Sequence, residues 1–280
     1  MSATIASYRT SDGYEIKYRH WSAQSEQPRG YVVALHGIQS HSGWYDFSCS
    51  KMAHAGYEVA FLDRRGSGLN SRQRGDALHV DRLINDVAQF INQQRYQRDP
   101  QAPLILLAVS WGGKLAATVT ARHPQLVDAL ALLDPGICAR IEPTRWQLLQ
   151  LKLAELSGIT ARRVDIPLTD PALFTQSKEW QKFITNDPFR LHDVTIQFLL
   201  ANRQLDEEVK RSAEQISCPT LLLLAGQDRI IDNLATENYF QRLAAEQKKC
   251  ITFPNAAHTL EFEENRKEIF TTLINWLDSL

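Results

Sequence analysis

The sequence has no excess of charge of either sign and few cysteines. Its 280 residues include 31 lysines and arginines against 32 aspartates and glutamates. Neither nucleic acid nor an anionic membrane is therefore expected as a partner. The adjacent Arg64 and Arg65 are interpreted as a solvated or locally paired turn. The four cysteines are too scattered for a metal site or a dense disulfide framework, and they predict free thiols in a reducing compartment.

The sequence also lacks segments that would direct the chain to a membrane. No apolar run approaches the length of a membrane-spanning helix. Residues 1–5 are not a basic segment followed by an apolar one, so we expect a cytoplasmic protein with no secretory leader. The chain is long enough for one large core, and α/β folds of this size commonly form one domain. We therefore expect residues 1–280 to fold as a single domain.

Apolar residues alternate between strand-like and helix-like spacing along most of the chain. Segments 4–8 and 14–21 are strand-like, and Ser11-Asp12-Gly13 between them is a hairpin signal. Residues 79–95 carry apolar side chains at helical spacing, and residues 126–133 are strand-like. This alternation predicts an α/β fold with a mostly parallel central sheet and helices on both faces.

The most informative segment is a run of apolar residues, 104–109, that ends abruptly at Ser110 and continues into a helix-like stretch. The pattern predicts a buried strand, a sharp turn and a helix. Such a turn strains the backbone of its apical residue and brings neighbouring backbone segments close to it. Small residues must therefore flank the apical residue, as Ala108 and Gly112 do. Ala108 replaces the first glycine of the usual Gly-x-Ser-x-Gly pattern. Ser110 could simply cap the helix, but this setting also suits a nucleophile.

A serine nucleophile needs a base and a group that orients the base, and the chain offers both downstream. The buried strand predicted at 219–225 runs out into Asp228. The strand predicted at 250–253 is followed by a loop of small residues that carries His258. Serine, acid and histidine thus occur in the chain order of α/β-hydrolases, and each follows a strand, where crevices form in open α/β sheets.

Four further motifs carry a family resemblance. They are His36-Gly37 after a predicted strand, Ser40-His41-Ser42-Gly43-Trp44-Tyr45, Asp63-Arg64-Arg65-Gly66-Ser67-Gly68 and Ala256-Ala257-His258-Thr259-Leu260-Glu261. With the turn at Ser110 they resemble the serine α/β-hydrolase superfamily, and within it the monoacylglycerol lipase and lysophospholipase-like branch of the serine aminopeptidase S33 type. Trp44 replaces an arginine of that branch, and Ser67 stands where histidine is usual. The resemblance covers nearly the whole chain and implies the α/β-hydrolase fold.

The resemblance also bears on the remaining parts of the site. Asp134 is an alternative to Asp228 as the acid, because it also ends a predicted strand. The following Pro135-Gly136 is typical of a turn, so Asp134 could instead be a turn residue. The resemblance around residues 226–229 favours Asp228. By position, the oxyanion hole would consist of the backbone N–H groups of Ile38 and Trp111.

Between the strand that ends near Asp134 and the strand at 219–225 the alternation stops. Residues 137–216 have helical periodicity, and by position they form a helical cap over the active site. Candidate pocket residues in this cap are Trp146, Leu149, Leu153, Phe174, Trp180, Phe183 and Phe198. An apolar cap suits an acyl or alkyl group and could open at a lipid surface.

We therefore expect a serine hydrolase that cleaves carboxylic esters, such as a monoacylglycerol or lysophospholipid, through an acyl-enzyme. This chemistry requires no metal and no organic cofactor. An aminopeptidase, a thioesterase, a carbon–carbon bond hydrolase and a non-catalytic binding module remain alternatives. An aminopeptidase would need a carboxylate in the cap for the substrate amine, and the candidates are Glu142, Glu155, Glu179, Glu207 and Glu208. The oligomeric state stays open.

Overall fold

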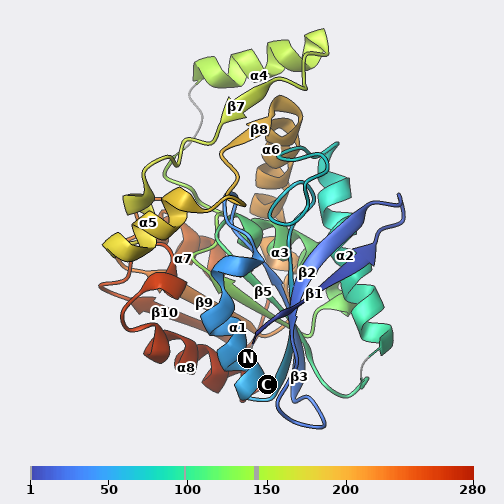
Figure 1. The fold of residues 1–280 in the computed structure, drawn as a ribbon, viewed down its shortest axis with the longest axis vertical. Coiled ribbons are helices and arrows are strands. Elements are labelled where there is room, and N and C mark those ends of the chain that lie inside the picture. The colour runs from blue at the N-terminus through green and yellow to red at the C-terminus, as the bar shows by residue number, and fades with distance from the viewer. Residues whose placement is uncertain (1, 98, 142–144) are drawn as a thin grey trace.

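A central sheet of eight strands, in the order β1-β2-β4-β3-β5-β6-β9-β10, carries the fold (Figure 1). The computed structural model describes residues 2–97, 99–141 and 145–280. The strands are β1 (Thr4–Arg9), β2 (Glu15–Trp21), β3 (Gly30–Leu35), β4 (Tyr57–Leu62), β5 (Leu104–Val109), β6 (Ala129–Leu133), β9 (Thr220–Ala225) and β10 (Lys248–Phe253). The pairs β1–β2 and β2–β4 are antiparallel, and all other neighbours are parallel. The predicted mostly parallel sheet is confirmed.

Helices cover both faces of this sheet. They are α1 (Asp46–His54), α2 (Val80–Gln97), α3 (Trp111–Arg122), α7 (Asn233–Gln241) and α8 (Arg266–Leu277). The chain moves one way along the sheet from β3 to β4 and the other way from β4 to β5. Right-handed crossovers therefore place α1 on one face and α2 and α3 on the other. Helix α8 packs against α1, and α2 packs against α3.

The core lies along the central strands. Every residue of β5, β6 and β9 is buried. Strands that are covered on both faces are apolar throughout, which is why these segments are continuous apolar runs in the sequence. The strand predicted at 126–133 begins only at Ala129, because Pro124 starts a short 3-10 turn that ends at Leu126. Within the described residues, no helix is both long and apolar enough to cross a membrane.

The segment between β6 and β9 forms a separate layer at the carboxyl ends of the strands. Its elements are α4 (Arg145–Ser157), β7 (Arg163–Asp165), α5 (Lys178–Asn186), β8 (Asp193–Thr195) and α6 (Ile196–Ser212). Short 3-10 helices lie at Ser42–Trp44, Pro124–Leu126, Pro171–Leu173, Ala213–Gln215 and Leu260–Phe262. In addition to the predicted helices, β7 and β8 pair as a small antiparallel sheet. Strands of three residues are too short to show a period in the sequence, so this sheet was not predicted.

Candidate active site

Ser110 sits at the apex of the turn between β5 and α3. Its backbone is strained, with φ 52° and ψ −124°, a conformation that a residue with a side chain rarely adopts. The Ser110 carbonyl accepts hydrogen bonds from the N–H groups of Gly113 and Gly136, at 2.8 and 2.6 Å. A Cβ atom at Gly112 would lie 2.7 Å from the His36 carbonyl oxygen, which explains the small residue at this position. The expected turn is therefore present.

His258 and Asp228 lie beside this serine. The His258 Nε2 atom is 2.8 Å from Ser110 Oγ, and His258 Nδ1 is 2.7 Å from Asp228 Oδ2. An ionised carboxylate only accepts hydrogen bonds, so Nδ1 carries the proton and Nε2 can accept from the serine hydroxyl. The other oxygen of Asp228 accepts from the N–H groups of Ile230 and Ile231, at 2.7 and 2.9 Å, which holds the carboxylate in place. The three predicted residues thus form one hydrogen-bonded chain.

Asp134, the rival acid, lies in the same region but has a different partner. Its Oδ1 atom accepts from the Ala225 N–H at 2.6 Å, and no hydrogen bond joins it to His258 in the described part of the chain. Burial raises the pKa of Asp134 well above its ordinary value, and the negative charge of Asp228 raises it further. A protonated Asp134 beside an ionised Asp228 avoids two adjacent charges. The geometry therefore favours Asp228 as the partner of His258.

The loop after β3, which carries Ile38, packs against the turn at Ser110. A Cβ atom at Gly37 would lie 3.2 Å from Ser110 Cβ, so the two backbones are in close contact. His36 holds the loop: the Arg64 N–H donates to its Nε2 at 2.9 Å, and its Nδ1 donates to the Gly37 carbonyl at 2.7 Å. Burial, together with the charge of Arg64, lowers the pKa of His36 to about 3, so His36 is neutral at physiological pH. Ile38 follows Gly37 in this loop, and Trp111 follows Ser110, so their N–H groups remain the expected oxyanion donors.

The candidate pocket residues divide into three groups. Phe174 lies edge-on to His258, with 6.0 Å between the ring centres, and Phe198 lies 5.6 Å from the Trp111 ring. Trp180 and Phe183 pack with Phe262 instead. The remaining three, Trp146, Leu149 and Leu153, are exposed on α4. Among the ring contacts of these described residues, those of Phe174 and Phe198 reach the predicted site.

The described glutamates considered for binding an amine are exposed or paired with an arginine. Glu155, Glu179 and Glu207 are exposed, and Glu208 is paired with Arg122. Glu142 lies outside the described residues. The structure thus places no carboxylate from the described members of this set beside Ser110.

Sequence reasoning missed a connection between the cap and the loop after β3. The Asp187 carboxylate, at the end of α5, accepts from the Trp44 indole N–H at 2.6 Å and lies 3.0 Å from His41 Nε2. The Leu191 N–H also donates to the Gln39 carbonyl at 2.9 Å. His41 and Asp187 are 146 residues apart, so no local pattern could reveal the pair. These bonds fasten this part of the cap to the loop that carries Ile38.

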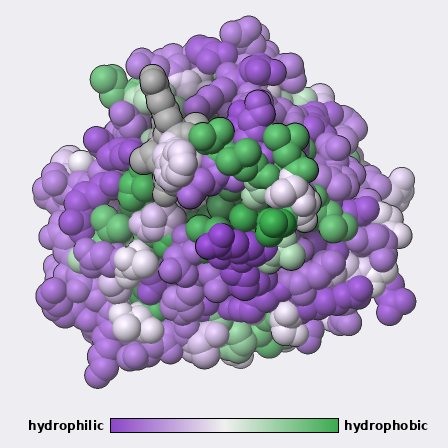
Figure 2. Space-filling view, turned by 90° about the horizontal axis from the view of Figure 1, so that it is seen from above, coloured by the Kyte–Doolittle hydropathy of each residue, from purple (hydrophilic) through white to green (hydrophobic). Residues whose placement is uncertain are grey.

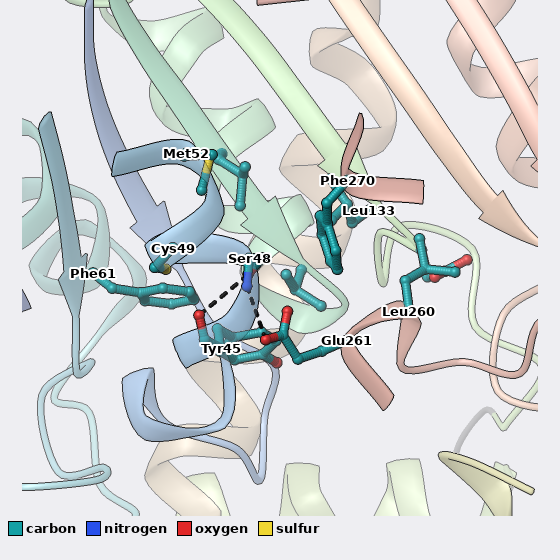
Figure 3. Close-up of a pocket in the computed structure, with 12 residues that line it drawn as sticks. Tyr45, Ser48, Cys49, Met52, Phe61, Leu133, Leu260, Glu261 and Phe270 are labelled. Atoms are coloured by element: carbon teal, nitrogen blue, oxygen red, sulfur yellow. Dashed lines mark hydrogen bonds between the residues drawn. The ribbon is translucent and has the colours of Figure 1, made fainter. Parts of the chain in front are cut away.

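A small internal cavity lies beneath the site, between α1 and the loop after β10 (Figure 3). Apolar side chains such as Phe61 and Phe270 line it, together with the carboxyl groups of Asp134 and Glu261. Glu261 Oε1 accepts from the Ser48 N–H at 3.0 Å, whereas Oε2 has no hydrogen-bond partner among the described residues. A buried carboxylate with one unpaired oxygen is costly, so Glu261 favours its protonated form.

Glu261 is expected to make the protein less stable as the pH rises. Burial raises the pKa of Glu261 to about 8, whereas a glutamate of an unfolded chain titrates at about 4.3. At a pH between these two pKa values, Glu261 is protonated in the folded state and ionised in the unfolded state. The free energy of unfolding therefore falls with rising pH, by up to about 1.4 kcal/mol per pH unit. Glu261→Gln removes this titration and keeps an oxygen that can accept from Ser48.

Denaturant unfolding at about pH 5 and about pH 8 measures this effect. We expect Glu261→Gln to gain stability relative to the wild type, and to gain more at the higher pH. Glu264→Gln, at an exposed neighbouring position, is the matched control and should differ little from the wild type. A gain from Glu261→Gln that is the same at both pH values would show that Glu261 does not titrate in this range.

The fold and the turn at Ser110 define the class of protein. A mostly parallel eight-stranded sheet, with a strained serine between β5 and α3 and a cap inserted after β6, is the α/β-hydrolase fold. The family model of serine aminopeptidase, S33, matches residues 26–265, and the chain belongs to this family.

Individual proteins are similar to this chain over most of its length. A monoacylglycerol lipase of Mycolicibacterium smegmatis is 25% identical, over 95% of this chain and 94% of the relative. The Escherichia coli protein YnbC is also 25% identical, but this chain spans only 46% of its length. Among solved structures, a soluble variant of the Saccharomyces cerevisiae monoglyceride lipase has a TM-score of 0.86 at 20% identity, covering 100% of this chain and 96% of that one.

Proposed function

We propose that this protein is a serine hydrolase that cleaves carboxylic esters of the monoacylglycerol or lysophospholipid type. The observation that carries the proposal is the hydrogen-bonded chain from Ser110 through His258 to Asp228. A serine hydroxyl is a poor nucleophile at neutral pH, and a neighbouring imidazole with a free Nε2 lone pair is the group that activates it. The strained turn presents this serine at the edge of the sheet.

The reaction follows from the positions of these groups. His258 takes the proton of Ser110 as its oxygen attacks the ester carbonyl, and Asp228 stabilises the imidazolium that forms. The N–H groups of Ile38 and Trp111 stabilise the negative oxygen of the tetrahedral intermediate. His258 then protonates the leaving alcohol, and an acyl group remains on Ser110. Water, activated in turn by His258, releases the acid, and no metal or organic cofactor takes part.

The proposed substrate class rests on the apolar surroundings of the site and on the relatives. Phe174 lies edge-on to His258, so an aromatic side chain borders the proposed site, which suits an acyl chain. Figure 2 looks onto the cap and shows apolar side chains gathered on this face. On α4, Trp146, Leu153 and Leu156 are 65%, 55% and 76% exposed. Such a surface suits an enzyme that meets its substrate in a lipid aggregate.

The compartment is proposed on a separate ground. The four cysteines are scattered along the sequence and form no dense disulfide framework, which fits a reducing compartment, and we place the enzyme in the cytoplasm.

A fluorophosphonate probe and a panel of substrates test the proposal. We expect the probe to label Ser110, and we expect hydrolysis of p-nitrophenyl butyrate and of a medium-chain monoacylglycerol or a lysophospholipid. Aminoacyl p-nitroanilides should be poor substrates, because the described candidate carboxylates of the cap do not lie at the serine. Preference for the anilides would replace the ester proposal by a peptidase, and labelling of a different serine would contradict the assigned nucleophile.

A further inference from the structure

Arg64 is a buried cation that forms no ion pair with a carboxylate in the described part of the chain. Its neighbour Arg65 is paired with Asp86 and Asp12, as the sequence allowed. Arg64 is only 8% exposed, so it is not the solvated residue that the sequence suggested. The Asp63 carboxylate next to it in the chain accepts from the Ser42 and Leu69 N–H groups, both at 2.7 Å. Arg64 Nε and Nη1 have no hydrogen-bond partner among the described residues.

The Arg64 side chain contacts both halves of the proposed oxyanion hole. Its Nη2 donates to the Ile38 carbonyl at 3.0 Å. Its guanidinium carbon lies 4.8 Å from the centre of the Trp111 ring and 4.9 Å from that of Phe198. The Trp111 indole N–H in turn donates to Asn202 of α6 at 2.7 Å. Arg64 is therefore packed between the loop after β3, the turn at Ser110 and the cap.

Keeping a cation in this place costs free energy. Burial disfavours the charged form and lowers the pKa of Arg64 to about 9, which still leaves the group protonated at neutral pH. The two aromatic faces offset part of the loss of hydration. The neighbouring buried arginine, Arg65, has carboxylates beside it, so the two adjacent positions differ in this respect. A tetrahedral intermediate at Ser110, the residue before Trp111, would carry a negative charge.

We propose that Arg64 is a positioning residue of the oxyanion hole. It fixes Ile38 and Trp111 in place, and its unneutralised charge favours the negatively charged intermediate over the neutral ester. The inference rests on the proposed ester hydrolysis. It adds a residue that is not part of the hydrogen-bonded series of Ser110, His258 and Asp228. Arg64 acts by holding Ile38 and Trp111 and by its charge, and neither effect needs contact with the substrate.

The test compares Arg64→Met with Arg64→Lys. Removing one direct oxyanion donor costs on the order of 10²–10³ in kcat, and for a group that acts through such donors we expect Arg64→Met to lose roughly 10- to 100-fold, with little change in KM. Arg64→Lys keeps the charge and should recover most of the loss. An alkyl trifluoromethyl ketone, whose adduct with a serine carries an oxyanion, should bind Arg64→Met more weakly by about the factor lost in kcat. The matching alcohol, which forms no oxyanion, should bind both equally.

Controls separate this inference from the proposed function. Ester hydrolysis by the wild type and its loss in Ser110→Ala test the proposed function, and this test does not depend on the role of Arg64. Arg65→Lys perturbs the neighbouring position and should lower the thermal stability without distinguishing the ketone from the alcohol. If Arg64→Met does not fold, Arg64→Gln, which removes the charge but keeps a donor for Ile38, takes its place. The inference is overturned by wild-type kcat in the neutral variant, by equal loss of ketone and alcohol binding, or by a lysine variant as impaired as the neutral one.

Discussion

Replacing Ser110 by alanine should lower kcat for ester hydrolysis by a factor on the order of 10⁴–10⁶. The substitution removes the attacking oxygen and leaves the rest of the site in place. The backbone at residue 110 keeps its hydrogen bonds to Gly113 and Gly136, because these involve the main chain. Substrate binding should therefore change little, and the loss should fall on kcat. Steady-state kinetics with p-nitrophenyl butyrate measures it, and the variant should no longer react with a fluorophosphonate.

Ser212 provides the matched control for this experiment. It is also a buried serine, but its hydroxyl donates to the Val209 carbonyl at the end of α6. Ser212→Ala should keep wild-type kcat and remain labelled. Substantial hydrolysis by Ser110→Ala, with the contaminating activity of the host excluded by a mock purification, would show that another residue is the nucleophile.

Asp228→Asn should lower kcat about 10⁴-fold, as the same change does in other enzymes with this arrangement. The oxygen of the asparagine amide would stay with the N–H groups of Ile230 and Ile231, which need an acceptor. The amide NH₂ would then face His258 Nδ1, which must become an acceptor. Its Nε2 would carry the proton and could no longer take one from Ser110. The base is lost although the shape of the site is kept.

Asp134→Asn is the matched comparison, since it makes the same change at the rival acid. Its Oδ1 accepts from the Ala225 N–H, which an amide oxygen can also do. We expect kcat within about threefold of the wild type, because no bond to His258 is altered. Kinetics of both purified variants, with circular dichroism to confirm folding, measures the contrast. Loss of activity in Asp134→Asn and its retention in Asp228→Asn would reverse the assignment of the acid.

Much of the architecture was readable from local patterns. The apolar runs of β5 and β9 predicted buried parallel strands because such strands are covered on both faces and need no polar side. The small residues Ala108 and Gly112 predicted the turn at Ser110 because only small side chains allow so close a backbone approach. These signals lie within a few residues of one another, so a single sequence contains them.

The chain order of serine, acid and histidine likewise follows from the sequence, since each residue ends a recognisable strand. The sequence offered two acids, and the resemblance favoured Asp228. The folded chain shows their partners: Asp228 Oδ2 lies at His258 Nδ1, whereas Asp134 Oδ1 accepts from the Ala225 N–H. Arg64 and Arg65 are adjacent arginines in one turn, and the sequence alone supports the same interpretation for both. In the folded chain Arg65 pairs with the Asp86 carboxylate, whereas the Arg64 guanidinium packs against the rings of Trp111 and Phe198. The partner of a charged side chain depends on residues that are distant in the sequence. Only tertiary packing brings such residues into contact.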